Sequence, residues 1–342
     1  MLVILTGAIK NLGDYLIGER ARQLIRHFTD EEIVEFSRFD SLDDKLDVIN
    51  RSKAVILCGG PAYASNIYPG IYPLCSPIDK IKVPIIPFGL GWSGSPFQQS
   101  EKFEFTPEAF EFLDKVHKEI SYSCCRDVIT QSILKRQGWD NVIMTGCPAW
   151  YDLEFMNQPF RIKKDIKKIV LTTPASRTLG NQFMEVLKMT QRQFPEATVY
   201  VSFHRGILFG KKMTPRKSLS YTMVAAKSLL RKAKVVDVSG DLKKIDFYAD
   251  CDLHIGYRVH GHLYFLAKRL PSILINEDGR GLGMGTSIGL PIFNYNDTEV
   301  LPKLDAQVSH YKNTQFEDFQ KVATFLDGHI GEMERFFKSL PL

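Results

Sequence analysis

The chain has 342 residues, of which 44% are hydrophobic, and its 44 basic and 39 acidic residues give a formal net charge of +5. Such a small positive excess argues against a nucleic-acid-binding protein, although it can help to attract an anionic substrate. The length predicts two domains of roughly 150 residues each rather than one small core.

Part of the positive charge is concentrated in two segments. Residues 161–168 contain five lysines and arginines, and further basic residues from Lys211 to Lys234 flank the apolar run Met223 to Leu230. Solvated helix faces and loops explain such segments in most proteins. The alternatives are contacts with an anionic acceptor or with the headgroups of a membrane that carries it.

The cysteines and the N-terminal residues predict a cytoplasmic protein. Cys124 and Cys125 are adjacent, Cys58 lies in an apolar run, and no pair has CxxC spacing, so we expect reduced core thiols. Residues 1–7 form an apolar strand pattern without the features of a signal peptide. Because no apolar stretch approaches the roughly 20 residues that span a bilayer, we expect at most peripheral contact with the inner face of the membrane.

The first half of the chain alternates short apolar strands, several of which end at glycines, with helices. The expected elements are a strand at Leu2 to Thr6, a helix at Tyr15 to Phe28, strands at Ala54 to Leu57 and Val83 to Phe88, a strand at Glu119 to Ser123 with a helix through Leu134, and a closing strand at Val142 to Thr145. This alternation is typical of an open parallel sheet, whose ligands bind at the carboxyl ends of its strands.

The second half repeats the alternation after an irregular stretch from Trp150 to Phe160. The expected elements are strands at Lys168 to Thr172, Thr198 to Phe203, Val235 to Val238, Leu253 to Gly256 and Ser272 to Asn276, with helices at Gln182 to Gln193, Tyr221 to Ala233, Leu242 to Tyr248 and His262 to Lys268. We therefore predict an α/β protein with two Rossmann-like domains, residues 1–155 and 162–314, that face a cleft. Residues 315–342 are expected to form one or two amphipathic helices that can pack back on the N-terminal domain.

Glycine-containing loops follow the strands of the first half. In the loop from Gly7 to Asp14, Asn11 makes the turn, and Asp14 either caps the next helix or faces the cleft and deprotonates or orients a ligand hydroxyl. Gly59-Gly60 and Gly89 to Gly91 allow backbone amides to approach a ligand. Neither is a six-residue dinucleotide fingerprint or a Walker A loop, which argues against an NAD-dependent dehydrogenase and a P-loop enzyme.

The strongest local signal lies between Asp252 and His262, where a strand is expected to give way to a helix. Arg258 is suited to bidentate capture of a carboxylate or phosphate, and His260 can donate to a phosphate oxygen or move a proton near neutral pH. The N-terminus of the following helix adds amide donors. Anion binding with catalysis is one interpretation, and the others are a structural cluster and an HxH metal site that lacks an evident third ligand.

Three further arginines follow predicted strands and are candidates for supporting contacts: Arg126, Arg177 and Arg205. Arg126 precedes Asp127, and an ion pair between the two at a helix start is at least as well supported as a ligand contact. The glycine-rich segment Asp278 to Gly289 is expected to be a loop, which either bends over a ligand or is an ordinary flexible connection.

Taken in order, several short motifs resemble those of the polysaccharide pyruvyltransferase family over about residues 3–290. The motifs are Asn11 to Asp14, Gly59-Gly60, Gly89 to Gly91, Arg126-Asp127, Gly146 to Ala149, and Arg258 to Gly261. At the fifth motif the family typically has Gly-Asp-Pro-Ala, so Cys147 departs from the pattern and puts a carboxylate role there in doubt. The resemblance implies two Rossmann-like domains arranged as in GT-B glycosyltransferases.

The resemblance also implies a transferase of cell-surface or exopolysaccharide biosynthesis, which joins pyruvate from phosphoenolpyruvate to two hydroxyls of a sugar or lipid-linked saccharide as a cyclic ketal. The donor is then expected on the C-terminal domain and the acceptor on the N-terminal domain, and no metal or other cofactor is expected. The expected catalytic residues are His260 and Asp14. The expected substrate-binding residues are Arg258, Val259, Arg126, Arg177, Asn11 and Gly60.

Two other functions stay compatible with the sequence. One is a GT-B glycosyltransferase that uses a nucleotide sugar, because fold alone does not determine the donor. The other is a non-catalytic protein that binds a phosphorylated metabolite. Thermal stabilisation by a sugar nucleotide rather than by phosphoenolpyruvate would identify the first, and binding without turnover would identify the second.

Overall fold

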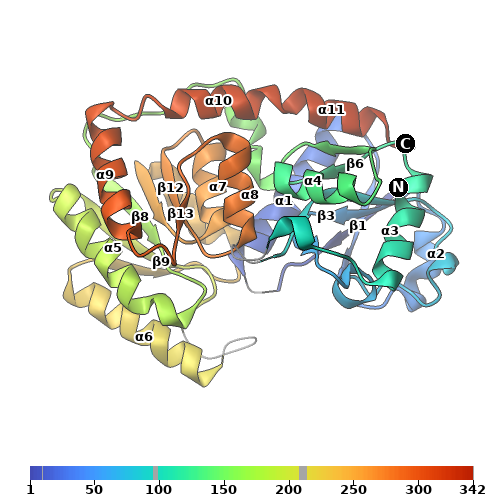
Figure 1. The fold of residues 1–342 in the computed structure, drawn as a ribbon, viewed down its shortest axis with the longest axis horizontal. Helices are drawn as coiled ribbons and strands as arrows, with labels where there is room; N and C mark the ends of the chain where they lie inside the picture. The colour runs from blue at the N-terminus through green and yellow to red at the C-terminus, as the bar shows by residue number, and fades with distance from the viewer. Residues whose placement is uncertain (10, 95–98, 208–213, 342) are drawn as a thin grey trace.

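Two parallel sheets form the centres of two α/β domains (Figure 1). The structure is a computed structural model that describes residues 1–9, 11–94, 99–207 and 214–341. The predicted fold class, an α/β protein with two Rossmann-like domains, is confirmed.

The N-terminal sheet has the strand order β2-β1-β3-β5-β6-β7, with β4 paired to β5. Its strands are β1 (Leu2–Thr6), β2 (Ile33–Ser37), β3 (Val55–Cys58), β4 (Pro61–Tyr63), β5 (Ile85–Trp92), β6 (Ser123–Cys125) and β7 (Val142–Met144). The central strands β1, β3 and β5 are buried along their whole length, as expected for a parallel sheet covered on both faces. The order reverses between β1 and β3, so a crevice opens at the carboxyl ends of these two strands.

The helices of the N-terminal domain are α1 (Leu12–Phe28), α2 (Leu46–Ile49), α3 (Pro107–Glu119) and α4 (Val128–Arg136). Helix α1 begins at Leu12 rather than at Tyr15, and both β2 and α3 escape the sequence-based assignment. Helix α3 nevertheless has recognisable start signals, because Thr106 accepts a hydrogen bond from the Ala109 amide (3.3 Å) and Pro107 occupies the first helical position.

The C-terminal sheet has the strand order β10-β9-β8-β11-β12-β13. Its elements are β8 (Lys168–Thr172), α5 (Gly180–Gln193), β9 (Thr198–Phe203), α6 (Pro215–Leu230), β10 (Lys234–Asp237), β11 (Leu253–Gly256), α7 (Val259–Ala267), β12 (Ser272–Asn276), α8 (Gly279–Ile288), β13 (Phe293–Asn294) and α9 (Val300–Asn313). The predicted strands β8, β9, β11 and β12 are confirmed at both ends. The order of this sheet reverses between β8 and β11, which places a second crevice beyond Thr172 and Gly256.

The segment expected as a glycine-rich loop, Asp278 to Gly289, is instead helix α8. Asp278 caps the helix by accepting a hydrogen bond from the Arg280 amide (3.0 Å), and Gly289 ends it with a φ of 76°. A Cβ at Gly283 would lie 2.5 Å from the carboxyl carbon of Asp127. The loop prediction is wrong because these glycines permit close packing of a helix rather than a flexible connection.

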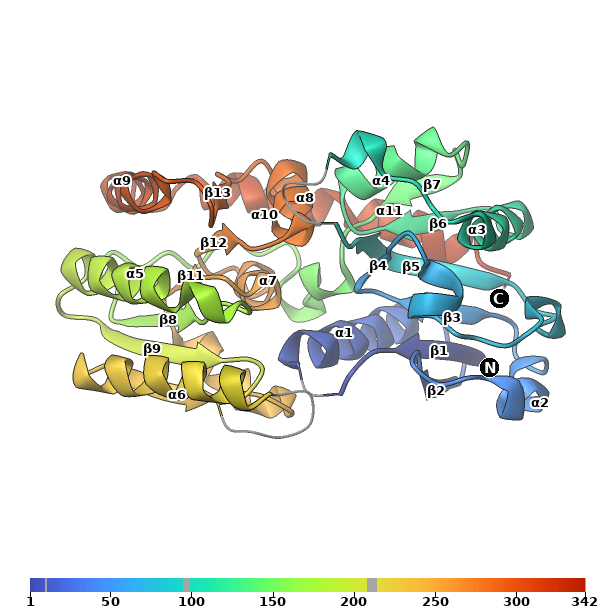
Figure 2. The same ribbon diagram turned by 60° about the horizontal axis from the view of Figure 1, so that its bottom comes forward.

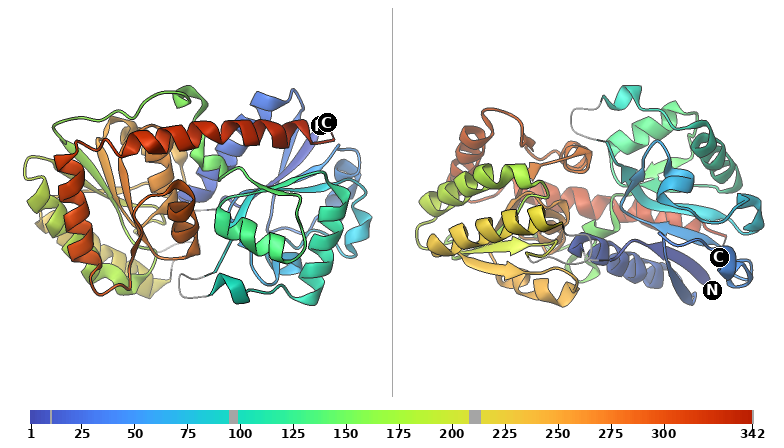
Figure 3. Two further views of the ribbon diagram at one scale, coloured as in Figure 1. Left: turned by 45° about the horizontal axis from the view of Figure 1, so that its top comes forward. Right: turned by 90° about the horizontal axis from the view of Figure 1, so that it is seen from below.

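Helices α10 (Phe319–Gly328) and α11 (Ile330–Lys338) cross from the C-terminal domain to the N-terminal domain, as the red band in the left view of Figure 3 shows. Phe336 packs on Phe88 of β5 with the ring centroids 5.6 Å apart, and Phe337 stacks on Phe28 of α1 at 4.8 Å. At the other end, Arg269 after α7 forms an ion pair with α10. The last helices therefore contact both domains.

Helix α1 extends toward the C-terminal domain from the N-terminal sheet (Figure 2). One apolar cluster includes Leu2 and Ile4 of β1 as well as Ile169 and Leu171 of β8, so the apolar core continues from one domain into the other. A second cluster covers the other face of the N-terminal sheet. Within the described ranges, no helix has the length and apolar character needed to cross a membrane.

Candidate active site

The strand ends at the β8 and β11 switch point place Arg258 next to the crevice. Thr172 of β8 lies opposite Gly256 of β11, and a Cβ at Gly256 would approach the Thr172 hydroxyl oxygen to 2.4 Å. Gly256 also has a φ of 153°, so glycine suits this position for two reasons. The amide of Arg258 donates to the same Thr172 hydroxyl (3.1 Å), which fixes the backbone where α7 begins.

Buried hydrogen bonds between side chains of β8, β11, β12 and α7 hold this strand end in place. Thr172 Oγ1 lies 2.8 Å from His254 Nε2, and Ser272 Oγ lies 2.8 Å from His254 Nδ1 and 2.7 Å from His262 Nδ1. Burial lowers the pKa of His262 to about 3 and the pKa of His254 well below its ordinary value. Both rings are therefore neutral at physiological pH and have a structural role.

The two histidines of the HxH pattern do not point to the same place. His260 and His262 are two residues apart on α7, and side chains at this spacing lie on different helix faces. His262 is committed to Ser272, whereas His260 lines the crevice. In the ranges that the structure describes, no group of three histidine, cysteine or acidic side chains is placed to hold a metal ion.

Arg258 and His260 line a small pocket that both domains form. The lining residues are Asn11, Gly13, His204, Arg205, Tyr257, Arg258, Val259, His260, Glu277 and Arg280. The free volume of the pocket is about 10 Å³, which is room for about one water molecule. The pocket therefore has to open before it can take a larger ligand.

The guanidinium of Arg258 is oriented but incompletely bonded. Its Nη2 donates to the Pro174 carbonyl (3.0 Å), while its buried Nε has no hydrogen-bond partner in the described structure. Such an unsatisfied buried donor costs about 1–3 kcal/mol, and an anion in the pocket would supply the missing acceptor. Helix α7 starts at the next residue without a side-chain cap, so its first amides add positive potential at the same place.

Two further arginines, Arg205 and Arg280, lie beside Arg258. Burial lowers the pKa of Arg205, and the charges of Arg258 and Arg280 lower it further. Arg280 is paired with Asp278, since its Nη2 lies 2.6 Å from Oδ2 and its Nε 2.9 Å from Oδ1. Among the described residues, Arg205 and Arg258 form no ion pair. The pocket therefore contains one buried cation, Arg258, and one partly buried cation, Arg205, that an anionic ligand can neutralise.

His260 is a neutral ring in this arrangement. Burial lowers its pKa to about 3, with further contributions from the charges of Arg280 and Arg126. At neutral pH the ring can thus donate a hydrogen bond from one nitrogen and accept one at the other. A bound anion would offset the arginine charges and raise the pKa of His260 again.

The N-terminal domain closes the pocket with small and polar residues at the start of α1. A Cβ at Gly13 would lie 2.2 Å from His260 Nδ1, so the helix start approaches the ring closely. Asn11 Nδ2 donates to Asp14 Oδ2 (3.2 Å). The interpretation of Asp14 as the helix cap is wrong, because Asn11 occupies the cap position and Asp14 lies in the first turn. Asp14 does act electrostatically on Arg205 and Arg280 across the pocket.

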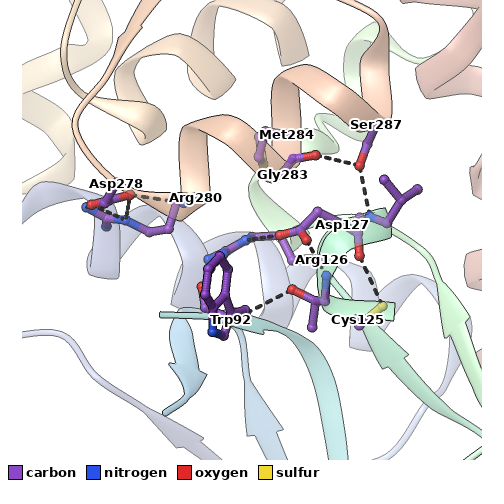
Figure 4. A network of polar contacts seen from close by, with 12 residues as sticks. Trp92, Cys125, Arg126, Asp127, Asp278, Arg280, Gly283, Met284 and Ser287 are labelled. Carbon is purple, nitrogen blue, oxygen red and sulfur yellow. Dashed lines mark hydrogen bonds and ion pairs between the residues drawn. The ribbon is translucent and has the colours of Figure 1, made fainter. Parts of the chain in front are cut away.

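Arg126 and Asp127 lie where the N-terminal domain contacts helix α8 of the C-terminal domain (Figure 4). Asp127 caps α4 by accepting from the Thr130 amide (2.7 Å), and Arg126 Nε donates to Asp127 (3.1 Å), so the expected ion pair at a helix start is present. Arg126 Nη2 donates to the Trp92 carbonyl (3.0 Å), and Nη1 is buried without a partner among the residues that the structure describes. Ser287 of α8 accepts from the first amide of α4, which binds the two domains together here.

Three other residues singled out in the sequence lie outside the pocket lining. Arg177 is exposed on the loop after β8. Gly60 has a φ of 87° and lies against the guanidinium of Arg38, so that a Cβ at this position would lie 2.8 Å from Nη1. Cys147 is fully buried, and burial raises the pKa of its thiol to about 11, which makes it a poor nucleophile at neutral pH.

The pocket also contains residues that the sequence did not single out. Arg280 stands in the segment expected as a loop, although its place after strand β12 and the Asp278 cap was a usable signal. His204 Nε2 lies 3.0 Å from the Tyr248 hydroxyl. Glu277 accepts from the amides of Ala175 and Ser176 at 2.7 to 3.0 Å, and so fixes the loop whose Pro174 carbonyl orients Arg258.

A larger groove of about 980 Å³ runs along the side of α1, from Tyr15 to His27. Its walls include Arg20 and Lys268, and both of these cations are already paired with Asp152. The other cations of this groove, Arg26 and Lys243, are exposed to solvent, whereas Arg258 in the smaller pocket is buried. We therefore take the smaller pocket as the candidate active site.

Comparison with known proteins connects this pocket to one family. A family model described as polysaccharide pyruvyl transferase matches residues 11–279, which include the start of α1 and the Arg258 segment. A search of curated proteins finds no match to the chain.

Solved structures share the fold at low sequence identity. MnaA of S. aureus, in a co-structure with UDP, is 12% identical, with 99% of this chain and 97% of that chain covered and a TM-score of 0.59. The UDP-GlcNAc 2-epimerase of Neisseria meningitidis, bound to UDP-GlcNAc, is 11% identical over 98% and 97% of the two chains, with a TM-score of 0.58. Both have the GT-B fold, so the predicted GT-B-like arrangement of the domains is confirmed.

Proposed function

Because the chain belongs to the polysaccharide pyruvyl transferase family, we propose that it transfers the pyruvyl group of phosphoenolpyruvate to a saccharide as a cyclic ketal. The observation that carries this proposal is the meeting of Arg205, Arg258 and the start of α7 in one pocket, with two cations left unpaired. Phosphoenolpyruvate has a carboxylate and a phosphate, and both groups are suited to bidentate arginine and to helix amides.

The reaction needs proton transfers but no oxidant. The donor methylene takes up one proton, the central carbon forms bonds to two acceptor oxygens, and its bond to the phosphate oxygen breaks. Each acceptor hydroxyl loses its proton, and the phosphate takes up one of them. Negative charge builds up on the departing phosphate, so cations that are fixed in place around the bound donor lower the barrier.

We assign the residues of the pocket to these steps. Arg258 and Arg205 bind the anionic groups of the donor, and the backbone at Val259 adds amide donors. His260 is neutral in the open pocket, gains basicity when the anion binds, and then moves a proton at the phosphate or the methylene. Asp14 enters from the other domain and acts as the base for the acceptor hydroxyl, steadied by the amide of Asn11.

The acceptor then approaches from the N-terminal domain, and the pocket opens between Gly13 and His260 to admit the donor. We place this transfer in the synthesis of a cell-surface polysaccharide, with a lipid-linked saccharide as the acceptor and without a metal cofactor.

The test follows phosphate release when the protein is incubated with phosphoenolpyruvate and a panel of free and lipid-linked saccharides. Acceptor-dependent phosphate release with a pyruvyl mass gain, lost in Arg258→Ala, is the expected result. UDP, which the structural neighbours are named as binding, serves as the comparison ligand. Thermal stabilisation by UDP or a UDP-sugar, with none by phosphoenolpyruvate and no ketal product, would overturn the proposal in favour of a glycosyltransferase.

A further inference from the structure

The outer face of α6 exposes an unusual number of apolar side chains. Four of the eight large hydrophobic side chains that are exposed in the described structure belong to this helix: Leu219 (64%), Met223 (51%), Leu229 (59%) and Leu230 (85%). Leu219, Met223 and Leu230 follow each other at helical spacing and share one stripe. The opposite face, with Tyr221, Val224 and Ser228, is buried against the domain, so the stripe is not needed for folding.

Positive charge surrounds this stripe, and negative charge is missing. Arg216 and Lys227 are exposed on the same side of the helix, and Arg231 and Lys232 are exposed just after it. The sequence from residue 197 to residue 236 holds nine lysines and arginines and no aspartate or glutamate. A helix with apolar side chains between basic ones, and no acidic ones, has the composition of a segment that lies in a bilayer interface.

We propose that the outer face of α6 docks on the surface of an anionic lipid bilayer. The apolar stripe enters the boundary between headgroups and acyl chains, and Arg216, Lys227, Arg231 and Lys232 contact lipid phosphates. A second copy of the chain fits this face less well, because a two-fold contact would bring the basic side chains of both helices together. The right view of Figure 3 shows α6 at the outside of its domain, with no other helix over it.

Docking at this face brings the active-site loops close to the lipid surface. Tyr221, on the buried side of α6, donates its hydroxyl hydrogen to the carbonyls of Pro174 (3.1 Å) and Ala175 (2.9 Å). The same Pro174 carbonyl accepts from Arg258. The helix that meets the lipid is therefore attached directly to the loop that orients the anion-binding arginine. The docking itself rests on the surface of α6 and not on the identity of the donor.

The experiment is co-sedimentation of the protein with vesicles of phosphatidylcholine alone and of phosphatidylcholine with about 30% phosphatidylglycerol, a composition chosen to match an anionic membrane. We expect binding to the anionic vesicles only, and weaker binding at high salt because the contacts are partly electrostatic. The double variant Met223→Glu with Leu230→Glu should lower the partition coefficient at least about tenfold. The double variant Lys227→Glu with Arg231→Glu should do the same and weaken the salt dependence, because only Arg216 and Lys232 remain of the four cations.

Matched controls separate docking from misfolding and from self-association. Phe110→Glu changes an exposed apolar side chain on α3, and Lys188→Glu a basic one on α5, and both variants should bind vesicles like the unchanged protein. Circular dichroism melting verifies that every variant folds. Equal binding by the α6 variants, or no binding to anionic vesicles by the unchanged protein, overturns the proposal. Light scattering that shows a dimer, lost in Leu230→Glu, would assign the stripe to a second copy instead.

Discussion

The two domains contribute opposite chemistry to the pocket they share. The C-terminal domain supplies Arg205, Arg258 and Arg280. Of these, Arg258 is fixed by buried hydrogen bonds to Thr172 and to the Pro174 carbonyl. The N-terminal domain supplies Asn11 and Gly13, a small polar and a small flexible residue, with an acidic side chain one residue further on. In the proposed function, the first side binds the anion, and the second offers close backbone approach and a base.

This difference follows from the two sheets. In both of them the strand order reverses once, between β1 and β3 and between β8 and β11, and the loops at these points face each other across the crevice. In the C-terminal sheet, helix α7 after strand β11 starts directly after Arg258. In the N-terminal sheet, the loop between β1 and α1 contains glycine and asparagine. The same topology therefore carries two unlike half-sites.

Low pH should give the largest difference between the two domains, because it lowers the stability of the C-terminal domain more. Of the buried histidines whose pKa is lowered, His204, His254, His260 and His262 belong to the C-terminal domain, and His117 belongs to the N-terminal one. The unfolded chain takes up these protons near pH 6.5, so stability is complete above that pH and is lost as the pH falls toward about 3. Each such histidine destabilises the fold by up to about 2 kcal/mol at pH 5.

Hydrogen exchange at pH 7 and pH 5 measures this directly. Amides of β8, β9 and β11 should lose protection at pH 5 before amides of β1 and β3. Equal loss of protection in both sheets would show that the buried histidines do not set the acid sensitivity.

Removal of Arg258 should have the next largest effect. Loss of one aligned donor to a developing anion typically lowers the rate about 100- to 1,000-fold, and Arg258→Ala also removes the charge that offsets the phosphate. Steady-state kinetics with phosphoenolpyruvate measures kcat/KM. Arg177→Ala is the control, because this exposed arginine lies outside the pocket, and a comparable loss in that variant would contradict the assignment.

Gly13→Ala tests the contribution of the N-terminal domain. The new Cβ would meet His260 Nδ1 at 2.2 Å, so either the ring or the helix start has to move. We expect kcat/KM to fall at least about tenfold while the melting temperature stays nearly unchanged. Gly18→Ala, on the same helix, makes only ordinary contacts of 3.6 Å and should retain activity with about 0.5–1 kcal/mol more stability.

Cys147→Asp should give the smallest effect. This change restores the residue that the family typically has, at a buried position where Arg126 is the charge with the largest effect on the side chain. Within the described residues, Nη1 of Arg126 has no hydrogen-bond partner. The new ion pair is expected to offset most of the cost of burying the carboxylate. A double-mutant cycle with Arg126→Met, followed by denaturant unfolding, should show a favourable coupling of about 1 kcal/mol. A coupling of zero would mean that the two positions do not interact.

Much of the fold is readable from the sequence because parallel strands buried on both faces are continuous apolar runs. Ile169 to Leu171 and Ile273 to Ile275 show this pattern, and their strands are predicted to the residue. Strand β2 lacks it, since Ile33 to Ser37 is only partly buried and contains Glu35. The glycines of α8 prevent its prediction as a helix from the sequence. Their role depends on the packing of Gly283 against Asp127, which is far away in the chain.

Only part of the candidate site can be predicted from the sequence. The Arg258 segment is recognisable because a permanent charge after an apolar strand has no packing role. Whether a given arginine lines the pocket depends on contacts that the sequence does not reveal. Neither Arg126 nor Arg177 belongs to the lining, because Arg126 is buried against Asp127 and Trp92 and Arg177 faces solvent. Arg280 is identified as a pocket residue only once the structure shows that its segment forms helix α8.

Helix α11 crosses back to the N-terminal domain, and this affects the order in which the two domains fold during synthesis. Phe336 and Phe337 complete the core around Phe88 and Phe28, yet they are synthesised after the whole C-terminal domain. During translation, the first domain therefore leaves the ribosome with an uncovered aromatic surface, while the second domain already has all of its strands. We therefore expect the N-terminal domain to finish folding after the C-terminal domain, which reverses the usual order. A ribosome stalled before Ile330 should carry a protease-sensitive first domain beside a more resistant second one.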